Sequence, residues 1–156
     1  MNFTNRFWHT AECFAFILAM LAAAGSVANA DNSQVAQIKT VSGQAEIVRN
    51  GARAAAKIGD PLYEKDTIET GADGSIGITF IDNTVMAGGP NSQIVLEDYK
   101  FNSSDFKGSM LTDMNRGTVS MISGDIARST PGAMKVKTPT AILAVRGTSF
   151  VIEVKP

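Results

Sequence analysis

The segment Asp73–Met86 reads DGSIGITFIDNTVM and determines the expected fold class of this chain. Its apolar residues Ile76, Ile78 and Phe80 are spaced two apart, which places them on one face of a β-strand. The Asp-Gly pair before them is typical of a hairpin turn, in which both central residues need positive φ. The Asp-Asn pair after them turns the chain into a second short strand. The segment therefore predicts β-structure bounded by tight turns.

The same pattern continues on both sides of this segment. Asn50-Gly51 is a strong hairpin signal, and Asp60-Pro61 marks another turn. No window shows a 3.6-residue period, and the 14 glycines suit a chain with many turns. We expect connections at Lys100–Asp105, Asn115–Gly117 and Ser129–Gly132. The sequence predicts an all-β domain of about ten short strands. The candidate segments from which these strands would be drawn lie near residues 37–41, 45–49, 66–70, 76–80, 84–86, 93–97, 109–113, 118–122, 134–137, 141–145 and 150–154.

The first thirty residues have the layout of a secretory signal peptide. A polar start is followed by an apolar run of eleven residues, Phe14–Ala24, and then by Ala28-Asn29-Ala30, a small-x-small cleavage pattern. The alternative is an uncleaved membrane anchor, but a spanning helix needs about 20 apolar residues. We therefore expect a signal peptide at residues 1–30, cleavage before Asp31, and a single domain over residues 36–155. Cleavage would remove the chain's single cysteine, histidine and tryptophan, which all precede residue 14.

Four segments in a fixed order carry a resemblance to a known family. They are Val41–Ala45, Gly59–Gly71, Gly74–Ser92 and Val136–Phe150. The last contains Thr138-Pro139 and Arg146-Gly147-Thr148 and is the most specific of the four. Together they resemble the FecR domain family of bacterial envelope proteins.

The resemblance implies a twisted, antiparallel, solenoid-like or sandwich β-domain outside the cytoplasm. In founding members this domain belongs to a membrane-spanning regulator that passes a signal from an outer-membrane receptor to a sigma factor. For this chain the resemblance implies the FecR-like domain itself, without that signalling pathway, and a periplasmic or secreted location. The family-motif residues, which we expect to be structural, are Thr70, Gly71, Asp82, Thr138, Pro139, Arg146, Gly147, Thr148 and Phe150.

The residue types argue against an enzyme. Without histidine or cysteine, the mature chain would lack the usual near-neutral base and the usual thiol nucleophile. The densest acidic set, Asp60, Glu64, Asp66 and Glu69, lies beside turns and strand ends, where carboxylates cap turns or face solvent. We expect no catalytic residues, no metal and no cofactor. The net charge of −1 also provides no basic field for nucleic acid.

The candidate binding residues are three aromatics, Tyr99, Phe101 and Phe106, in a polar stretch. They would form a patch for a protein or a glycan, or else cover one end of the sheet. For Arg146 the alternatives are a recognition surface and a structural role in which its donor fork ties strands together. We expect the structural role.

These observations predict a non-catalytic extracytoplasmic module that binds or senses, with an envelope protein as its partner and strand addition at an exposed edge as one route. A glycan- or peptidoglycan-binding module is the first alternative. A self-assembling structural protein is the second. No membrane span is expected after signal cleavage.

Overall fold

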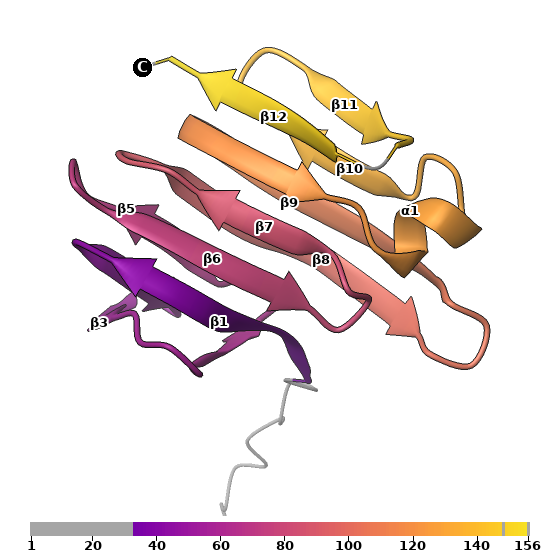
Figure 1. Cartoon of the computed structure of the whole chain (residues 1–156), viewed down its shortest axis with the longest axis horizontal. Coiled ribbons are helices and arrows are strands. Elements are labelled where there is room, and N and C mark those ends of the chain that lie inside the picture. Colours follow the sequence, from indigo (N-terminus) through magenta and orange to yellow (C-terminus); the bar gives the residue numbers. More distant parts are fainter. Residues whose placement is uncertain (1–32, 148, 156) are drawn as a thin grey trace, which may run out of the picture. The chain divides into compact units, whose positions relative to one another are not determined.

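The computed structural model describes residues 33–147 and 149–155. The predicted signal peptide and the motif residue Thr148 lie outside these ranges. The described residues form twelve strands and one short helix, which confirms the all-β prediction (Figure 1). The elements are β1 (Gln34–Ser42), β2 (Ala45–Arg49), β3 (Ala52–Ala55), β4 (Pro61–Tyr63), β5 (Thr67–Thr70), β6 (Ser75–Phe80), β7 (Val85–Gly88), β8 (Gln93–Asn102), β9 (Lys107–Ile122), α1 (Asp125–Ser129), β10 (Met134–Lys137), β11 (Ile142–Val145) and β12 (Ser149–Val154).

The strands form one curled sheet whose two halves face each other across the core. We call the half with strand order β4-β1-β6-β7-β9-β12 sheet A, and the half with order β3-β2-β5-β8-β9-β10-β11 sheet B. Neighbouring strands are antiparallel except β10, which runs parallel to β9. In Figure 1, β1, β6, β7 and β12 of sheet A lie in front of β5 and β8. The strands therefore form a half-barrel. Its open edges are β4 and β12 in sheet A and β3 and β11 in sheet B.

Strand β9 joins the two sheets and corrects one prediction. Its first part pairs with β8 and β10, whereas residues 117–122 pair with β7 and β12. The turn predicted at Asn115–Gly117 is instead a bend within one continuous strand. Gly117 has a φ of 95°, and a Cβ there would overlap Ser92. Glycine thus permits the local twist that carries β9 from one sheet to the other.

The two predicted Asn-Gly and Asp-Gly turns have different outcomes. Asn50-Gly51, with φ values of 51° and 81°, closes the β2–β3 hairpin as predicted. Asp73-Gly74 does not close a hairpin, because β5 before it belongs to sheet B and β6 after it to sheet A. Gly74 packs so closely on the carbonyl of Gln44 that a Cβ would overlap it. This tight corner carries the chain between sheets rather than back along its neighbour.

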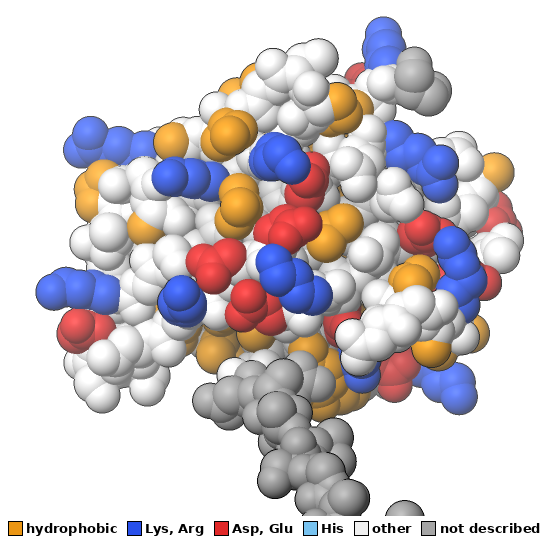
Figure 2. All heavy atoms as spheres, turned by 180° about the vertical axis from the view of Figure 1, so that it is seen from behind, with side chains coloured by type: hydrophobic (Ala, Val, Ile, Leu, Met, Phe, Trp, Pro, Cys, Tyr) orange, Lys and Arg blue, Asp and Glu red, His pale blue; other side chains and the backbone are white. Residues whose placement is uncertain are grey.

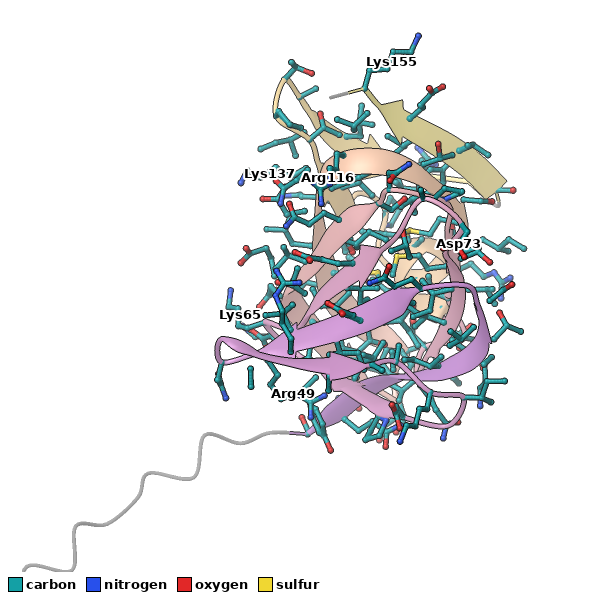
Figure 3. All side chains as sticks on the ribbon, turned by 90° about the vertical axis from the view of Figure 1, so that its left-hand side faces the viewer. Arg49, Lys65, Asp73, Arg116, Lys137 and Lys155 are labelled. Carbon is teal, nitrogen blue, oxygen red and sulfur yellow. The ribbon has the colours of Figure 1, made fainter. Side chains whose placement is uncertain are left out.

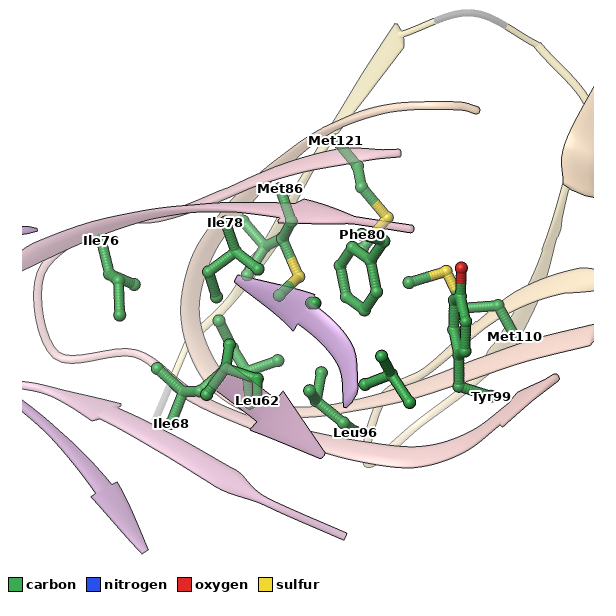
Figure 4. Close-up of a cluster of buried hydrophobic side chains, with 14 of the residues drawn as sticks. Leu62, Ile68, Ile76, Ile78, Phe80, Met86, Leu96, Tyr99, Met110 and Met121 are labelled. Carbon is green, nitrogen blue, oxygen red and sulfur yellow. The ribbon is translucent and has the colours of Figure 1, made fainter. Parts of the chain in front are cut away.

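The core lies between the two sheets and is formed by alternate residues of their strands. Figure 4 shows Ile76, Ile78 and Phe80 of β6 facing Leu62, Ile68 and Leu96. Ile142, in contrast, is exposed because it lies on the outer side of an edge strand. All five methionines of the described chain are buried in the core, where their flexible side chains can fill irregular gaps; they are Met86, Met110, Met114, Met121 and Met134.

Two predicted loops are partly regular structure. Strand β8 continues to Asn102, so the connection expected at Lys100–Asp105 is a shorter turn. The helix α1 includes Ser129, the first residue of the connection expected at Ser129–Gly132, and is five residues long, too short to show a helical period in the sequence. Within the described residues, the structure has no helix of the length and apolarity needed to cross a membrane.

Candidate binding surfaces

The three predicted aromatics do not form one surface patch. Tyr99 is buried, with 6% of its surface exposed, and its ring stacks on Phe80 at a centroid distance of 5.5 Å. A register shift between Leu96 and Asp98 reverses the alternation of β8 and turns Tyr99 inward, which the regular period could not reveal. Tyr99 therefore belongs to the core and is not available to a partner.

The other two aromatics also differ from each other. Phe101 is half-buried and packs against the core, whereas Phe106 lies at the β8–β9 turn with 52% of its surface exposed. Phe106 has a φ of 57°, and the hydroxyl of Ser129 donates a hydrogen bond to its carbonyl. Of the predicted patch, a single exposed ring remains, so the structure offers no aromatic platform at this turn.

The motif residue Asp82 organises a buried polar cluster. Its carboxylate accepts hydrogen bonds from the Tyr99 hydroxyl at 3.1 Å and from the hydroxyl and backbone N–H of Thr84 at 2.8 and 3.2 Å. The Asp82 N–H donates to the Tyr99 oxygen at 3.0 Å. Burial is the main cause that raises the pKa of Tyr99 far above its usual range, and the charge of the neighbouring Asp82 is the second cause. The cluster fixes the β6–β7 turn against β8 and the start of α1.

Two further motif residues, Thr70 and Gly71, connect the end of β5 to neighbouring segments by hydrogen bonds. The Thr70 hydroxyl donates to the Gly89 carbonyl at 2.7 Å and accepts from the Ser92 N–H at 2.8 Å. The Gly71 N–H donates to the Gln44 carbonyl at 2.8 Å. Both residues therefore make contacts that hold the corner between the sheets.

The C-terminal motif residues have less uniform surroundings. Thr138 closes the turn before β11, because its hydroxyl accepts from the Ala141 N–H at 3.1 Å, and Pro139 lies exposed in that turn. The Gly147 carbonyl accepts a hydrogen bond from Ser123, and Phe150 packs against the core. Arg146 is exposed and has no hydrogen bond or ion pair with any described residue, so the strand-tying role expected for it has no support there.

The acidic residues considered for catalysis are not brought together. Asp66 is buried against Arg49, and Glu69 accepts hydrogen bonds from Arg53 at 2.6 Å and Gln93 at 2.8 Å. These two hydrogen bonds lower the pKa of Glu69, and the one from Arg53 has the larger effect. In the ranges the structure describes, no group of three or more histidine, cysteine, aspartate or glutamate side chains is placed to hold a metal ion.

The outer face of sheet B carries charges that are paired with each other. Figure 2 shows basic and acidic side chains interleaved over the face turned away from the viewer in Figure 1. In Figure 3, Lys65, Arg116 and Lys137 lie along one side of the molecule. The ion pairs on this face are Arg53 with Glu46 and Glu69, Lys65 with Glu97, and Lys137 with Asp113. This face therefore presents no strong field of one sign.

A groove opens at the end of the sheet formed by β3 and β4, between the inner side of the β2–β3 hairpin and the start of β4. Its volume is about 570 Å³. Small or apolar side chains form most of its wall, with Arg49, whose side chain Figure 3 places at this end of the molecule. The lining residues are Ile47, Arg49, Asn50, Ala52, Ala54, Asp60 and Pro61.

Arg49 holds the two sides of the groove together. Its guanidinium donates to both carboxylate oxygens of Asp66, at 2.7 and 2.8 Å, and to the Pro61 carbonyl at 3.0 Å. It also lies over the Tyr63 ring, 4.3 Å from the centroid. The Asp66 hydrogen bonds raise the pKa of Arg49. Because its charge is matched by a buried carboxylate, Arg49 acts as a fixed wall of the groove rather than as a free cation.

Strand β3 forms the rim of this groove and has a free edge. It pairs with β2, and no other described strand lies beside it. All four of its residues are exposed, and three of them are alanine. Small side chains leave the unpaired N–H and C=O groups of such an edge accessible to another strand. The groove and this free edge therefore lie side by side at the same end of the sheet.

The opposite end of the sheet has two more free edges, β11 and β12. Several large apolar side chains are exposed in the described structure, and three of them lie at this end. The exposed fractions of their surfaces are 65% for Ile142, 42% for Leu143 and 65% for Val151. β11 lies within the segment that carried the most specific sequence motif, Val136–Phe150, and β12 begins at the end of that segment. This end is thus the second candidate interaction surface.

Comparison with known proteins extends these observations. The model of the FecR protein family matches residues 66–156, more than half of the chain. No curated protein and no solved structure matches the chain. The matched residues include β5 to β12, and with them the Asp82 cluster, the bend at Gly117 and both C-terminal edges. The resemblance expected from the motifs is confirmed: the chain belongs to the FecR family.

Proposed function

We propose that this protein is a non-catalytic binding module of the cell envelope that takes up an extended segment of a protein partner along β3. The groove beside the free β3 edge carries this proposal. Membership of the FecR family, a regulatory family not known for enzymes, supports a role in protein interaction.

The geometry of β3 favours strand addition. A partner strand would form backbone hydrogen bonds with residues 52–55, and its alternate side chains would point into the groove. Ala52 and Ala54 face the groove, because they pair with Arg49 and Ile47 on the inner side of the hairpin. Their small side chains leave the space that the partner's side chains would fill.

The lining of the groove indicates the kind of segment it would accept. Ile47, Pro61 and the two alanines are apolar, and the Arg49 charge is already paired. Asp60 accepts a hydrogen bond from the Lys57 N–H at 2.9 Å. A segment with uncharged, apolar residues at alternate positions would therefore bring no unpaired charge of its own against the paired Arg49.

The test is site-specific photo-crosslinking in living cells, with a photoreactive phenylalanine at Ala54 and, as a control, at Ala87, an exposed alanine on the outer face of sheet A. The expected result is one envelope protein crosslinked from Ala54 and absent from Ala87, with the crosslink in an extended apolar segment.

A second variant makes the test specific for strand addition. Ala54→Glu places a carboxylate in the apolar groove and should abolish the crosslink formed from a probe at Ala52. Hydrogen exchange should show that the amides of residues 52–55 become protected when the partner is bound. Equal crosslinking from both faces, or a partner that binds without protecting β3, would contradict the proposal.

A further inference from the structure

The edges of β11 and β12 leave the core incompletely covered. β12 pairs with β9 and β11 with β10, and no strand in the described ranges lies beyond either. Phe150 and Ile152 of β12 lie opposite the fully buried Met121 and Val119, yet both are themselves only half-buried. Sheet A therefore ends with apolar side chains that face inward but lack neighbours on one side.

Strand β11 shows the same feature in sheet B. Val145 and Leu143 pair with the buried residues Met134 and Val136 and so lie on the inner side. Leu143 nevertheless has 42% of its surface exposed. The core is thus open between the two edges, and completing it requires apolar side chains supplied from outside the described chain.

β12 carries few of the features that usually prevent strand pairing. Natural edge strands are protected by short length, proline, charged side chains (lysine above all), inward-pointing charge or a bulge. β12 spans six residues without proline or a register shift, and its single charged residue, Glu153, points outward. β11 has no charged residue. Both backbones are therefore open to another strand.

We propose that a second copy of this chain covers this end, with β12 antiparallel to β12 of the partner about a two-fold axis perpendicular to the sheets. Such an axis keeps inner faces on the inside, so each sheet continues into the corresponding sheet of the other copy. The half-buried row of each copy then packs against the same row of the other. A two-fold pairing uses one self-complementary surface.

The side chains of β12 specify the register. With Ile152 opposite Ile152 of the other copy, Phe150 faces Val154, and all three inner residues meet apolar partners. Outside, Val151 faces Glu153. A shift of two residues in one direction would oppose the two Glu153 carboxylates, which is unfavourable. A shift in the other direction would leave Val154 without an apolar partner.

The size of the contact sets the expected strength. Five paired residues of β12 extend about 17 Å along the strand, at about 3.3 Å per residue. A single strand pair of this length is a small contact beside a standard stable interface, which buries roughly 1,600 Å² in total. The dimer should therefore dissociate in the micromolar range, on the order of 10 μM, and mass should depend on concentration.

The experiment is sedimentation velocity of the purified protein from about 1 to 200 μM, a range that brackets this dissociation constant. Two substitutions at the exposed Val151 test the register. Val151→Glu would place like charges opposite each other twice in the dimer and should weaken dimerisation about tenfold or more at low salt. Val151→Lys would face Glu153 and should leave dimerisation unchanged or strengthen it.

Controls separate this proposal from the β3 proposal and from misfolding. Ala54→Glu, at the opposite end of the sheet, should not change the dimer. Far-UV circular dichroism and melting should match the wild type for both Val151 variants, because that side chain is 65% exposed. A monomer at every concentration, or equal effects of Glu and Lys at Val151, would overturn the proposed pairing.

Discussion

Replacing Tyr99 by phenylalanine removes a single buried oxygen and leaves the rest of the ring in place. That oxygen donates to the Asp82 carboxylate at 3.1 Å and accepts from the Asp82 N–H at 3.0 Å. Stacking on Phe80, at 5.5 Å between centroids, does not depend on the hydroxyl. The substitution therefore tests the polar cluster without opening a cavity in the core.

The expected loss of stability follows from these two hydrogen bonds. A hydrogen bond to a charged group contributes about 1.5–3 kcal/mol, and a buried N–H left without a partner costs about 1–3 kcal/mol. Because both effects act on Asp82, they do not add fully, and we expect a loss of about 3 kcal/mol in the free energy of unfolding. For a domain of this size that is a fall of about 10 °C in Tm.

The assay is urea unfolding of the wild type and of Tyr99→Phe, followed by circular dichroism. The matched control is Tyr63→Phe, at the second of the chain's two tyrosines. Tyr63 lies under Arg49, and the phenylalanine ring would keep that contact. We expect the control to stay within about 0.5 kcal/mol of the wild type.

One result would refute the reasoning for Tyr99. If Tyr99→Phe unfolded within about 0.5 kcal/mol of the wild type at an unchanged m-value, the hydroxyl would not be needed to satisfy Asp82. Asp82 would then find other donors, and the Tyr99 contact would not account for the burial of this carboxylate.

Three further predictions concern the bend, the groove wall and the charged face. Gly117→Ala should cost about 2–3 kcal/mol on thermal unfolding, since the φ is 95° and the methyl group would overlap a neighbouring serine. Gly132→Ala, also at positive φ but in open space, should cost about 1 kcal/mol. Arg49→Met should lower the free energy of unfolding in urea by about 2 kcal/mol, because it leaves the buried Asp66 carboxylate without its charged partner. Arg53→Met, which removes a solvent-exposed ion pair, should change stability much less. Arg53 lowers the pKa of Glu69, so the ionised Glu69 carboxylate stabilises the folded state above about pH 4.3. This stabilisation is lost as the pH falls through the lowered pKa. Urea unfolding between about pH 5.5 and 3 should therefore show a shallower loss of stability for Arg53→Met than for the wild type.

Local signals in the sequence were sufficient for the fold class and for most strands. Alternation identified the inner row of β6, and Asn50-Gly51 identified the β2–β3 hairpin, because both depend on neighbouring residues alone. The family motifs were likewise recognisable in order. These features need no knowledge of which strands meet in space.

Local signals failed where a residue's role depends on a distant partner. The Asn-Arg-Gly at 115–117 resembles a turn, but pairing of β9 with strands of both sheets makes it a bend within a strand. Asp73-Gly74 resembles a hairpin, but its flanking strands pair elsewhere. Tyr99 resembles a surface aromatic, but a register shift against β9 turns it inward.

The sequence by itself therefore determined that this chain is a β-protein of the FecR type. Tertiary structure decided which aromatics are buried, where the groove lies and which edges stay free. The reason is that strand alternation is encoded locally, whereas register, sheet order and edges are set by pairing between residues far apart in the chain. The surfaces proposed for binding depend on that second kind of information.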